Sequence, residues 1–299
     1  MSSESFSLSR GEFTYFFVRT VQSSLASYSE EELKTLGYDK SKSPSDQKYD
    51  DEKTWFDVFL SGTLEYTREL LALCEAAKKA EVTLDASDGF DLKLKNFKSR
   101  IESTYSVDFE KYLEITYYGY TSSREFERAF ELELLANKFS SQIEARIIDS
   151  ISDERIDAYI EENIEVPNMS KTRSIMLIVT DSAVRAEEIR ADLPEENFAS
   201  LAKKHSMSAT YLYENCRPGD LRPALEAWLG EDGRAVGDIG TVEDGGKFSL
   251  IYYFDDGEPI AVLDAKEALA RDDYKEFISA LLEKFPVITN EEILASLDI

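Results

Sequence analysis

The sequence predicts an α+β protein, made of a long helical part and a smaller part in which strands and helices alternate. Three observations predict it: helical spacing of apolar residues up to residue 168, apolar runs with β-branched members beyond that point, and helical spacing again over residues 265–285. The chain has 299 residues, more than one core organises efficiently, so about two domains are expected.

The first part of the chain carries the helical spacing. Helices are expected over residues 54–79, 90–105 and 108–117, after an aromatic helix that begins within residues 6–17. Their apolar side chains recur three or four residues apart, as in helices that bury one face. This part is therefore expected to be a packed helical lobe.

Capping signals mark two further helices. Ser122 with Glu125 three residues later has the pattern of a capping box, and apolar side chains at i+4 spacing follow it as far as Ile147. Ser152 is expected to cap a shorter helix that ends before Pro167, because proline restricts its predecessor to extended geometry. The helical lobe is therefore expected to end near residue 168.

Strand patterns appear beyond this boundary. Buried strands are expected over residues 174–179 and 248–254, and helices over residues 182–193 and 197–205. A long helix over residues 265–285 then leads into an extended end at 286–288. The second part is thus expected to hold a sheet with helices between its strands.

Charge and composition restrict the partners. The chain has 60 acidic and 34 basic residues, a net charge of -26, which opposes binding to nucleic acid or to an anionic membrane. Attraction to basic unfolded proteins is one interpretation of this charge, and a solvated acidic surface is the commoner one. The hydrophobic fraction of 42% supplies enough apolar side chains for packed cores.

Cysteine and histidine are scarce. Cys74 and Cys216 form no CxxC pair and one histidine is present, so neither a metal site nor a disulfide framework is predicted. No apolar run approaches the roughly 18 residues of a membrane span. The first ten residues have neither the charged nor the apolar region of an export signal, so such a signal is expected to be absent from this chain.

The second part contains four notable motifs: NFASLAKKHS at 197–206, LYEN at 212–215, PGDLRPALEAW at 218–228 and VGDIGTVE at 236–243. Together they resemble the parvulin-type peptidyl-prolyl isomerase domain. The residues of these motifs and their order are similar to those of the export foldases of Gram-positive bacteria. No single motif is as specific as a metal-ligand signature, so the resemblance rests on their order and spacing together.

The flanking sequence resembles the helical lobe of PrsA/SurA-like foldases, in YDDEKTW at 49–55, YGYTS at 118–122 and LELLA at 132–136. The resemblance implies a helical chaperone lobe over residues 1–168 and an inserted parvulin-like α/β domain over 169–261. Residues 262–299 would form a C-terminal helix and an extended tail that return to the lobe.

The resemblance also implies a site. Rotation about an X-Pro bond requires loss of amide resonance, a barrier of about 18–20 kcal/mol, and needs no cofactor and no metal. The apolar pocket of the family corresponds in position to Leu212, Leu221 and Leu225, with Met176 on the first strand. The alternative is that the leucines are ordinary core residues.

The polar half of the implied site departs from the family. Parvulins place one histidine in the first strand and another in the last, and these positions fall at Ser174 or Met176 and at Ser249 or Leu250. The family's cysteine or aspartate position falls near Ser208. Ser208 and Ser249 are therefore the candidate catalytic residues, with hydroxyls in place of the missing histidines.

The single histidine has other interpretations. His205 is expected at a helix C-terminus, where interaction with the helix dipole is the commoner role. A nucleophilic pair of Cys216 and His205 would be a different enzyme, but no third group that would orient it can be identified in the sequence.

Two functional hypotheses follow from the resemblance. In the first, the chain is an extracytoplasmic, cell-surface folding factor with a membrane anchor in its precursor, and it binds unfolded or proline-containing polypeptide clients with weak or no isomerase activity. In the second, it is an active parvulin-type isomerase that uses hydroxyl side chains. The missing histidines favour the first.

Overall fold

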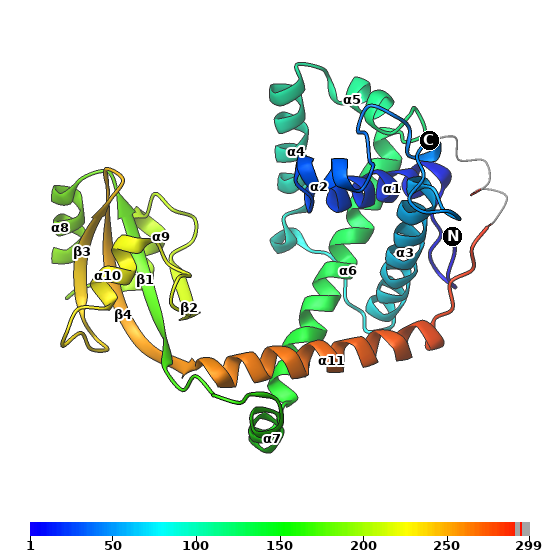
Figure 1. The fold of residues 1–299 in the computed structure, drawn as a ribbon. Coiled ribbons are helices and arrows are strands. Elements are labelled where there is room, and N and C mark those ends of the chain that lie inside the picture. The colour runs from blue at the N-terminus through cyan, green and yellow to red at the C-terminus, as the bar shows by residue number, and fades with distance from the viewer. Residues whose placement is uncertain (291–293, 295–299) are drawn as a thin grey trace. The chain divides into compact units, whose positions relative to one another are not determined.

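The structure is a computed structural model that describes residues 1–290 and 294. It contains two compact units (Figure 1). The helical unit consists of residues 1–149 together with the segment that begins at Asp272, and the sheet unit consists of Ser150–Arg271. The mixed helical and sheet composition confirms the predicted class at this level.

The helical unit contains the helices expected from spacing. Helices α3, α4 and α5 confirm the predictions for residues 54–79, 90–105 and 108–117, and the six-residue helix α2 was not expected. The helices of the unit up to its boundary are α1 (Arg10–Ala26), α2 (Glu30–Thr35), α3 (Trp55–Lys79), α4 (Phe90–Tyr105), α5 (Phe109–Thr116) and α6 (Ser123–Ser150).

Capping residues fix where two of the helices begin. The Ser122 N–H donates to Glu125 Oε2 at 3.0 Å, and the Glu125 N–H donates to Ser122 Oγ at 3.4 Å, which completes the predicted capping box of α6. Ser152 accepts from the Arg155 N–H at the start of α7 (Asp153–Asn163), as predicted.

Aromatic packing holds α4 and α5 against α1 and α6. The Phe126 ring of α6 is 1% exposed. Its centroid lies 5.0 Å from that of Tyr15, 5.2 Å from that of Phe97 and 5.2 Å from that of Phe109. Edge-to-face and offset pairs of this kind stabilise beyond the area that they bury. The aromatic cluster therefore fixes the four helices around one point.

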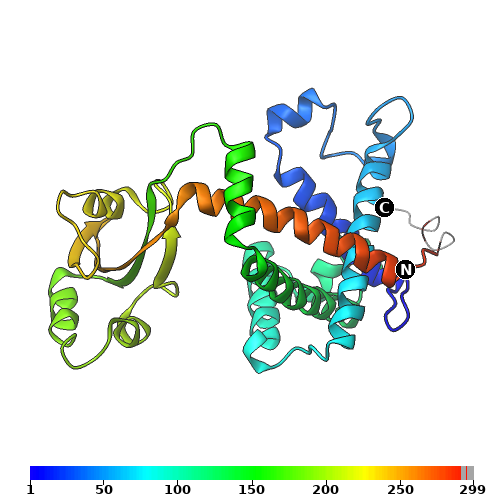
Figure 2. The same ribbon diagram turned by 90° about the horizontal axis from the view of Figure 1, so that it is seen from below.

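The C-terminal segment completes the helical unit. Helix α11 (Ile260–Lys284) runs through the boundary between the units, and Leu281 and Phe285 are buried in the core of the helical unit. Ser2 and Ile288 exchange backbone hydrogen bonds of 2.9 and 2.8 Å, so residues after α11 lie beside the N-terminus (Figure 2). The predicted extended end is confirmed there, and residues 291–293 and 295–299 of the predicted tail lie outside the described residues.

The sheet unit contains a four-stranded antiparallel sheet in the order β2-β1-β4-β3. Strands β1 and β4 confirm the two predicted strands and lie at the centre, whereas β2 and β3 at the edges were not predicted. Its elements after α7 are β1 (Lys171–Thr180), α8 (Ala183–Ala191), α9 (Phe198–His205), β2 (Leu212–Cys216), α10 (Pro223–Leu229), β3 (Ile239–Asp244) and β4 (Lys247–Pro259).

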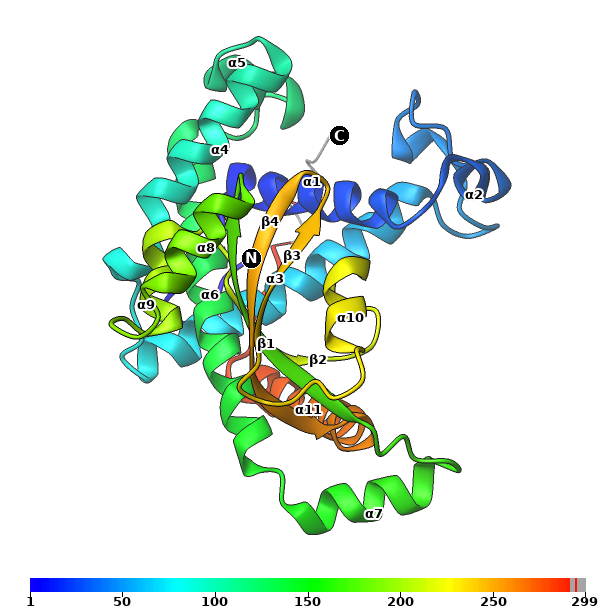
Figure 3. The ribbon, with the colours of Figure 1, turned by 90° about the vertical axis from the view of Figure 1, so that its left-hand side faces the viewer.

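Helix α10 lies on one side of the sheet and α8 and α9 lie on the other (Figure 3), and each face carries its own apolar cluster. Successive side chains of β1 point to opposite faces, so Ile175 and Leu177 pack with α10 while Ile178 packs with α8 and α9. Both faces are therefore covered by helices, which explains why β1 and β4 read as nearly continuous apolar runs.

The unit boundaries differ from the domain limits predicted at 168 and 261. Ile156 of α7 is buried with Ala265 of α11, and Tyr159 and Val262 pack against the same cluster. Because these contacts tie α7 to the first half of α11, the compact units divide at 149/150 and 271/272.

Candidate functional site

The two strand serines at positions where the resemblance implies a histidine are buried and hydrogen-bonded. Ser249 on β4 is 1% exposed, and its Oγ accepts from Arg222 Nη2 at 3.1 Å, while Arg222 Nη1 lies 2.7 Å from Asp244 Oδ2. Ser174 on β1 is also buried and accepts from the Asn215 N–H at 3.1 Å. Both hydroxyls therefore have structural partners that tie the strands to their neighbours.

The candidate pocket leucines of α10 and its preceding turn lie in the core. Leu221 is 8% exposed and Leu225 is 1% exposed. Both belong to the cluster that includes Ile175, Leu177 and Ile251 of the central strands. Protein side chains therefore cover the surfaces that a proline ring would contact.

The other predicted site residues lie elsewhere. Met176 belongs to the cluster on the opposite face of the sheet from Leu221 and Leu225. Leu212 lies on the edge strand β2, opposite Met176 in the ladder, and is 39% exposed. Ser208 lies in the loop after α9, where its N–H donates to Ser206 Oγ at 3.2 Å. The structure thus brings Leu221, Leu225 and Ser249 to one face and does not gather the six residues into a single pocket.

The alternative nucleophilic pair is not assembled either. Arg185 Nη2 donates to His205 Nδ1 at 3.0 Å, at the C-terminus of α9 where this histidine was expected. Burial, with the nearby carboxylates of Asp220 and Glu226, raises the pKa of the Cys216 thiol to about 11. A thiol held protonated in this way is a weak nucleophile.

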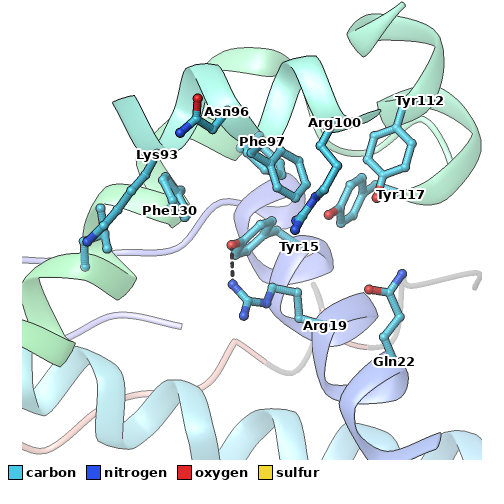
Figure 4. A pocket seen from close by; sticks show the side chains of 12 residues that line it. Tyr15, Arg19, Gln22, Lys93, Asn96, Phe97, Arg100, Tyr112, Tyr117 and Phe130 are labelled. Carbon is cyan, nitrogen blue, oxygen red and sulfur yellow. Dashed lines mark hydrogen bonds between the residues drawn. The ribbon is translucent and has the colours of Figure 1, made fainter. Parts of the chain in front are cut away.

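The helical unit contains a pocket of about 640 Å³ that the sequence did not indicate (Figure 4). Its walls come from α1, α4, the α5 region and α6, and the residues that line it extend from Tyr15 to Leu134 in the chain. The side chains that line it are aromatic, cationic or neutral polar, with one leucine: Tyr15, Arg19, Gln22, Lys93, Asn96, Phe97, Arg100, Tyr112, Tyr117, Phe126, Phe130 and Leu134.

A hydrogen-bonded network fixes one wall of the pocket. Arg19 donates to the Tyr15 hydroxyl at 2.8 Å, and that hydroxyl donates to Glu133 Oε2 at 2.9 Å. Arg19 also forms an ion pair with Glu133, and the Tyr66 hydroxyl donates to the same carboxylate at 3.3 Å. Burial, together with the Glu133 charge, raises the pKa of Tyr15, so its phenol is neutral at ordinary pH.

A second hollow of about 250 Å³ adjoins the first, because Gln22 and Tyr112 line both. It is lined further by Tyr105, Val107, Ile115 and Thr116. Tyr105 is 59% exposed and Ile115 is 61% exposed. Large apolar side chains are therefore accessible beside the larger pocket.

The described residues offer little for other chemistry. Among residues 1–290 and 294, no group of three or more histidine, cysteine, aspartate or glutamate side chains is placed to hold a metal ion. In the same part of the chain, no helix has the length and apolar character needed to cross a membrane. The arrangement is one that can bind a ligand by stacking, apolar contact and charge.

No known protein-family profile matches the chain, and no match is found among characterised proteins. Solved structures similar to it include PrsA from Bacillus subtilis, at 15% identity over 82% of this chain and 89% of that one, with a TM-score of 0.44. Foldase protein PrsA from Streptococcus pneumoniae is 12% identical over 80% and 85% of the two chains, with a TM-score of 0.31. A SurA-like chaperone from Campylobacter jejuni is 12% identical over 100% and 98%, with a TM-score of 0.27. The chain is thus similar in structure, at a low level, to PrsA and SurA-like foldases of several bacteria.

Proposed function

We propose that this protein is an extracytoplasmic folding factor that binds exposed segments of unfolded client proteins in the pocket of its helical unit. In this proposal the sheet unit is a parvulin-like domain whose peptidyl-prolyl isomerase activity is weak or lost. The sequence motifs at 197–243 and the flanking motifs at 49–136 support the family. The geometry of the two candidate sites supports binding by the helical unit rather than catalysis by the sheet unit.

The observation that carries the proposal is the contrast between the two candidate sites. Leu221, Leu225 and Ser249 are each less than a tenth exposed and have protein partners. The pocket between α1, α4 and α6 is open and lined by aromatic rings. A chaperone that binds without catalysis requires such an accessible apolar surface and no polar catalytic network.

Two assays on the full chain separate binding from catalysis. The first measures suppression of aggregation of a chemically unfolded client, and the second measures cis/trans isomerisation of a proline peptide. We expect suppression at near-stoichiometric amounts and isomerisation at the uncatalysed rate, because Ser174 and Ser249 are buried and hydrogen-bonded rather than free to assist loss of amide resonance.

A matched pair of variants ties the suppression to the pocket. Gln22 is exposed and lines both hollows, so Gln22→Trp would fill their shared entrance. Ser99 is exposed on α4 and does not line the pocket, so Ser99→Trp is the control with the same added side chain. We expect suppression to fall in Gln22→Trp and to persist in Ser99→Trp.

The competing function is an isomerase that uses hydroxyls. Isomerisation well above the uncatalysed rate, reduced in Ser249→Ala or in Leu212→Glu at the exposed edge strand, would contradict the proposal that the protein only binds. Equal suppression by Gln22→Trp and the unaltered protein would remove the pocket from the function.

A further inference from the structure

The charges around the pocket of the helical unit have the opposite sign to those of the protein as a whole. The chain carries 60 acidic and 34 basic residues. The side chains that line the pocket include Arg19, Lys93 and Arg100 and no aspartate or glutamate. A net charge of -26 would place carboxylates in most hollows of this size if they were distributed at random.

Two of these cations form no ion pair within the part of the chain that the structure describes. Arg19 is paired with Glu133, whereas Lys93 and Arg100 form no ion pair with any residue that the structure describes. Both are exposed on α4, spaced seven residues apart on the side that holds the pocket (Figure 4). Their charges are therefore available to a ligand in the hollow.

The same face offers apolar contact beside the charge. Phe97 lies between Lys93 and Arg100 on α4 and, with Phe130 and Tyr112, lines the pocket. The adjoining hollow with Tyr105 and Ile115 extends this apolar surface. A ligand that fits must present a carboxylate and an aromatic or aliphatic group within a few residues of each other.

We infer that the pocket selects client segments in which acidic residues flank an aromatic or large aliphatic residue. This inference rests on the proposed function, because it names the class of segment that the folding factor holds. The acidic surface elsewhere repels long polyanions such as nucleic acid, whereas a short segment can place one or two carboxylates against Lys93 and Arg100. The pocket thus has a selectivity opposite to that expected from the net charge, which by itself would attract basic clients.

Fluorescently labelled peptides test the inference on the full chain. Two peptides share a central Phe-X-Phe segment, one flanked by glutamates and the other by lysines. We expect the acidic peptide to bind more tightly in the pocket, with an affinity that falls as salt is added, since partly exposed ion pairs are screened.

Charge-removing variants locate the effect. Lys93→Gln combined with Arg100→Gln is expected to weaken binding of the acidic peptide by about twofold to thirtyfold, from two exposed charge pairs. Lys95 is exposed on the same helix, lies outside the pocket and has no ion pair with a described residue, so Lys95→Gln with Lys34→Gln gives the control that removes the same charge. The control is expected to bind as the unaltered protein does.

Three results would overturn the inference. The first is equal affinity for the two peptides, and the second is an equal loss of affinity for the acidic peptide in the control variant and in the pocket variant. The third is displacement of the acidic peptide by inorganic phosphate at a concentration similar to that of the peptide, which would make the site one for any small anion. If one of these results is found while the protein still suppresses client aggregation and Gln22→Trp reduces that suppression, the inference fails and the proposed function stands. If suppression is also unaffected by that variant, the proposed function fails with it.

Discussion

The two units use their apolar side chains in different ways. In the sheet unit, β1 and β4 bury one set of side chains under α10 and the alternate set under α8 and α9. In the helical unit, Phe126 contacts aromatic rings of three other helices, and a hollow of about 640 Å³ remains beside them. The comparison shows that apolar positions of a motif such as Leu221 and Leu225 can belong to the core, and in the proposed function binding uses another surface of the same chain.

The two tryptophans make this comparison measurable, because each unit contains one. Trp55 is buried in the helical unit and Trp228 in the sheet unit. A Trp55→Phe background therefore reports unfolding of the sheet unit by fluorescence, and a Trp228→Phe background reports unfolding of the helical unit. The substitution's own effect cancels when variants are compared within one background.

The largest expected effect is the loss of a core side chain in the sheet unit. Leu225→Ala should lower the free energy of unfolding of that unit by about 2–5 kcal/mol, the range for large-to-small changes at buried sites. Denaturant titration of Trp228 fluorescence in the Trp55→Phe background measures it. A change below about 1 kcal/mol would show that Leu225 lines an accessible pocket rather than the core.

The second effect is on the pH dependence of stability. The free energy of unfolding should fall more steeply at alkaline pH for the helical unit than for the sheet unit. Burial raises the pKa values of Tyr15, Tyr66 and Tyr117 in that unit, and it raises the pKa of Tyr253 in the sheet unit to about 12. A raised phenol pKa means that the folded state holds the proton more tightly than the unfolded chain. The stabilisation is therefore complete below pH 10.0, the ordinary tyrosine value, and declines as the pH rises above it.

Denaturant midpoints at pH values from neutral to strongly alkaline check this, with Trp55 reporting the helical unit and Trp228 the sheet unit. The slope of stability against pH above 10.0 should be steeper for the helical unit and should be reduced by Tyr66→Phe. Equal slopes in the two units would contradict the difference in phenol burial.

Much of the fold could be predicted because its signals are local. The spacing of apolar residues in α3 and α4 and the caps at Ser122 and Ser152 each lie within one segment. The edge strands β2 and β3 were missed because they are short and partly exposed, so they lack a strong alternating pattern. The packing of Ile156 on Ala265, which places α7 and the first half of α11 in one compact unit, joins residues about a hundred positions apart and leaves no local signal in the sequence.

The candidate site was less predictable than the fold. Motif position singled out Leu221, Leu225 and Ser249, which the structure brings to one face of the sheet, but it could not show that their surfaces are covered. The pocket of the helical unit draws on α1, α4 and α6, and no pattern in the sequence links Tyr15 to Arg100 or Phe130. The available signal was the high aromatic content of this part of the chain, which packing of the core alone also explains.

A smaller effect is expected at the buried serine of β4. Ser249→Ala removes the acceptor for Arg222 Nη2, but Arg222 keeps its ion pair with Asp244, so the loss should be about 0.5–1.5 kcal/mol. Denaturant titration of Trp228 fluorescence measures the loss, and the proline-peptide assay should show no accompanying change in rate. A fall in isomerisation with unchanged stability would instead assign the hydroxyl a catalytic role.

The smallest effect is expected at Ser208, the other candidate catalytic hydroxyl. Its backbone N–H, which the substitution keeps, makes the 3.2 Å hydrogen bond to Ser206 Oγ, and its side chain lies in a loop. Ser208→Ala should therefore change the stability of the sheet unit by less than about 0.5 kcal/mol and leave both isomerisation and client binding as they were. Ser206→Ala is the informative control, because Ser206 Oγ also accepts from the Val179 N–H of β1 at 3.2 Å. Its removal should therefore lower the stability of the sheet unit more than Ser208→Ala does. If Ser208→Ala were the more damaging of the two in the isomerase assay, the sheet unit would hold a working site after all, and the division between a filled sheet unit and a binding helical unit would have to be abandoned.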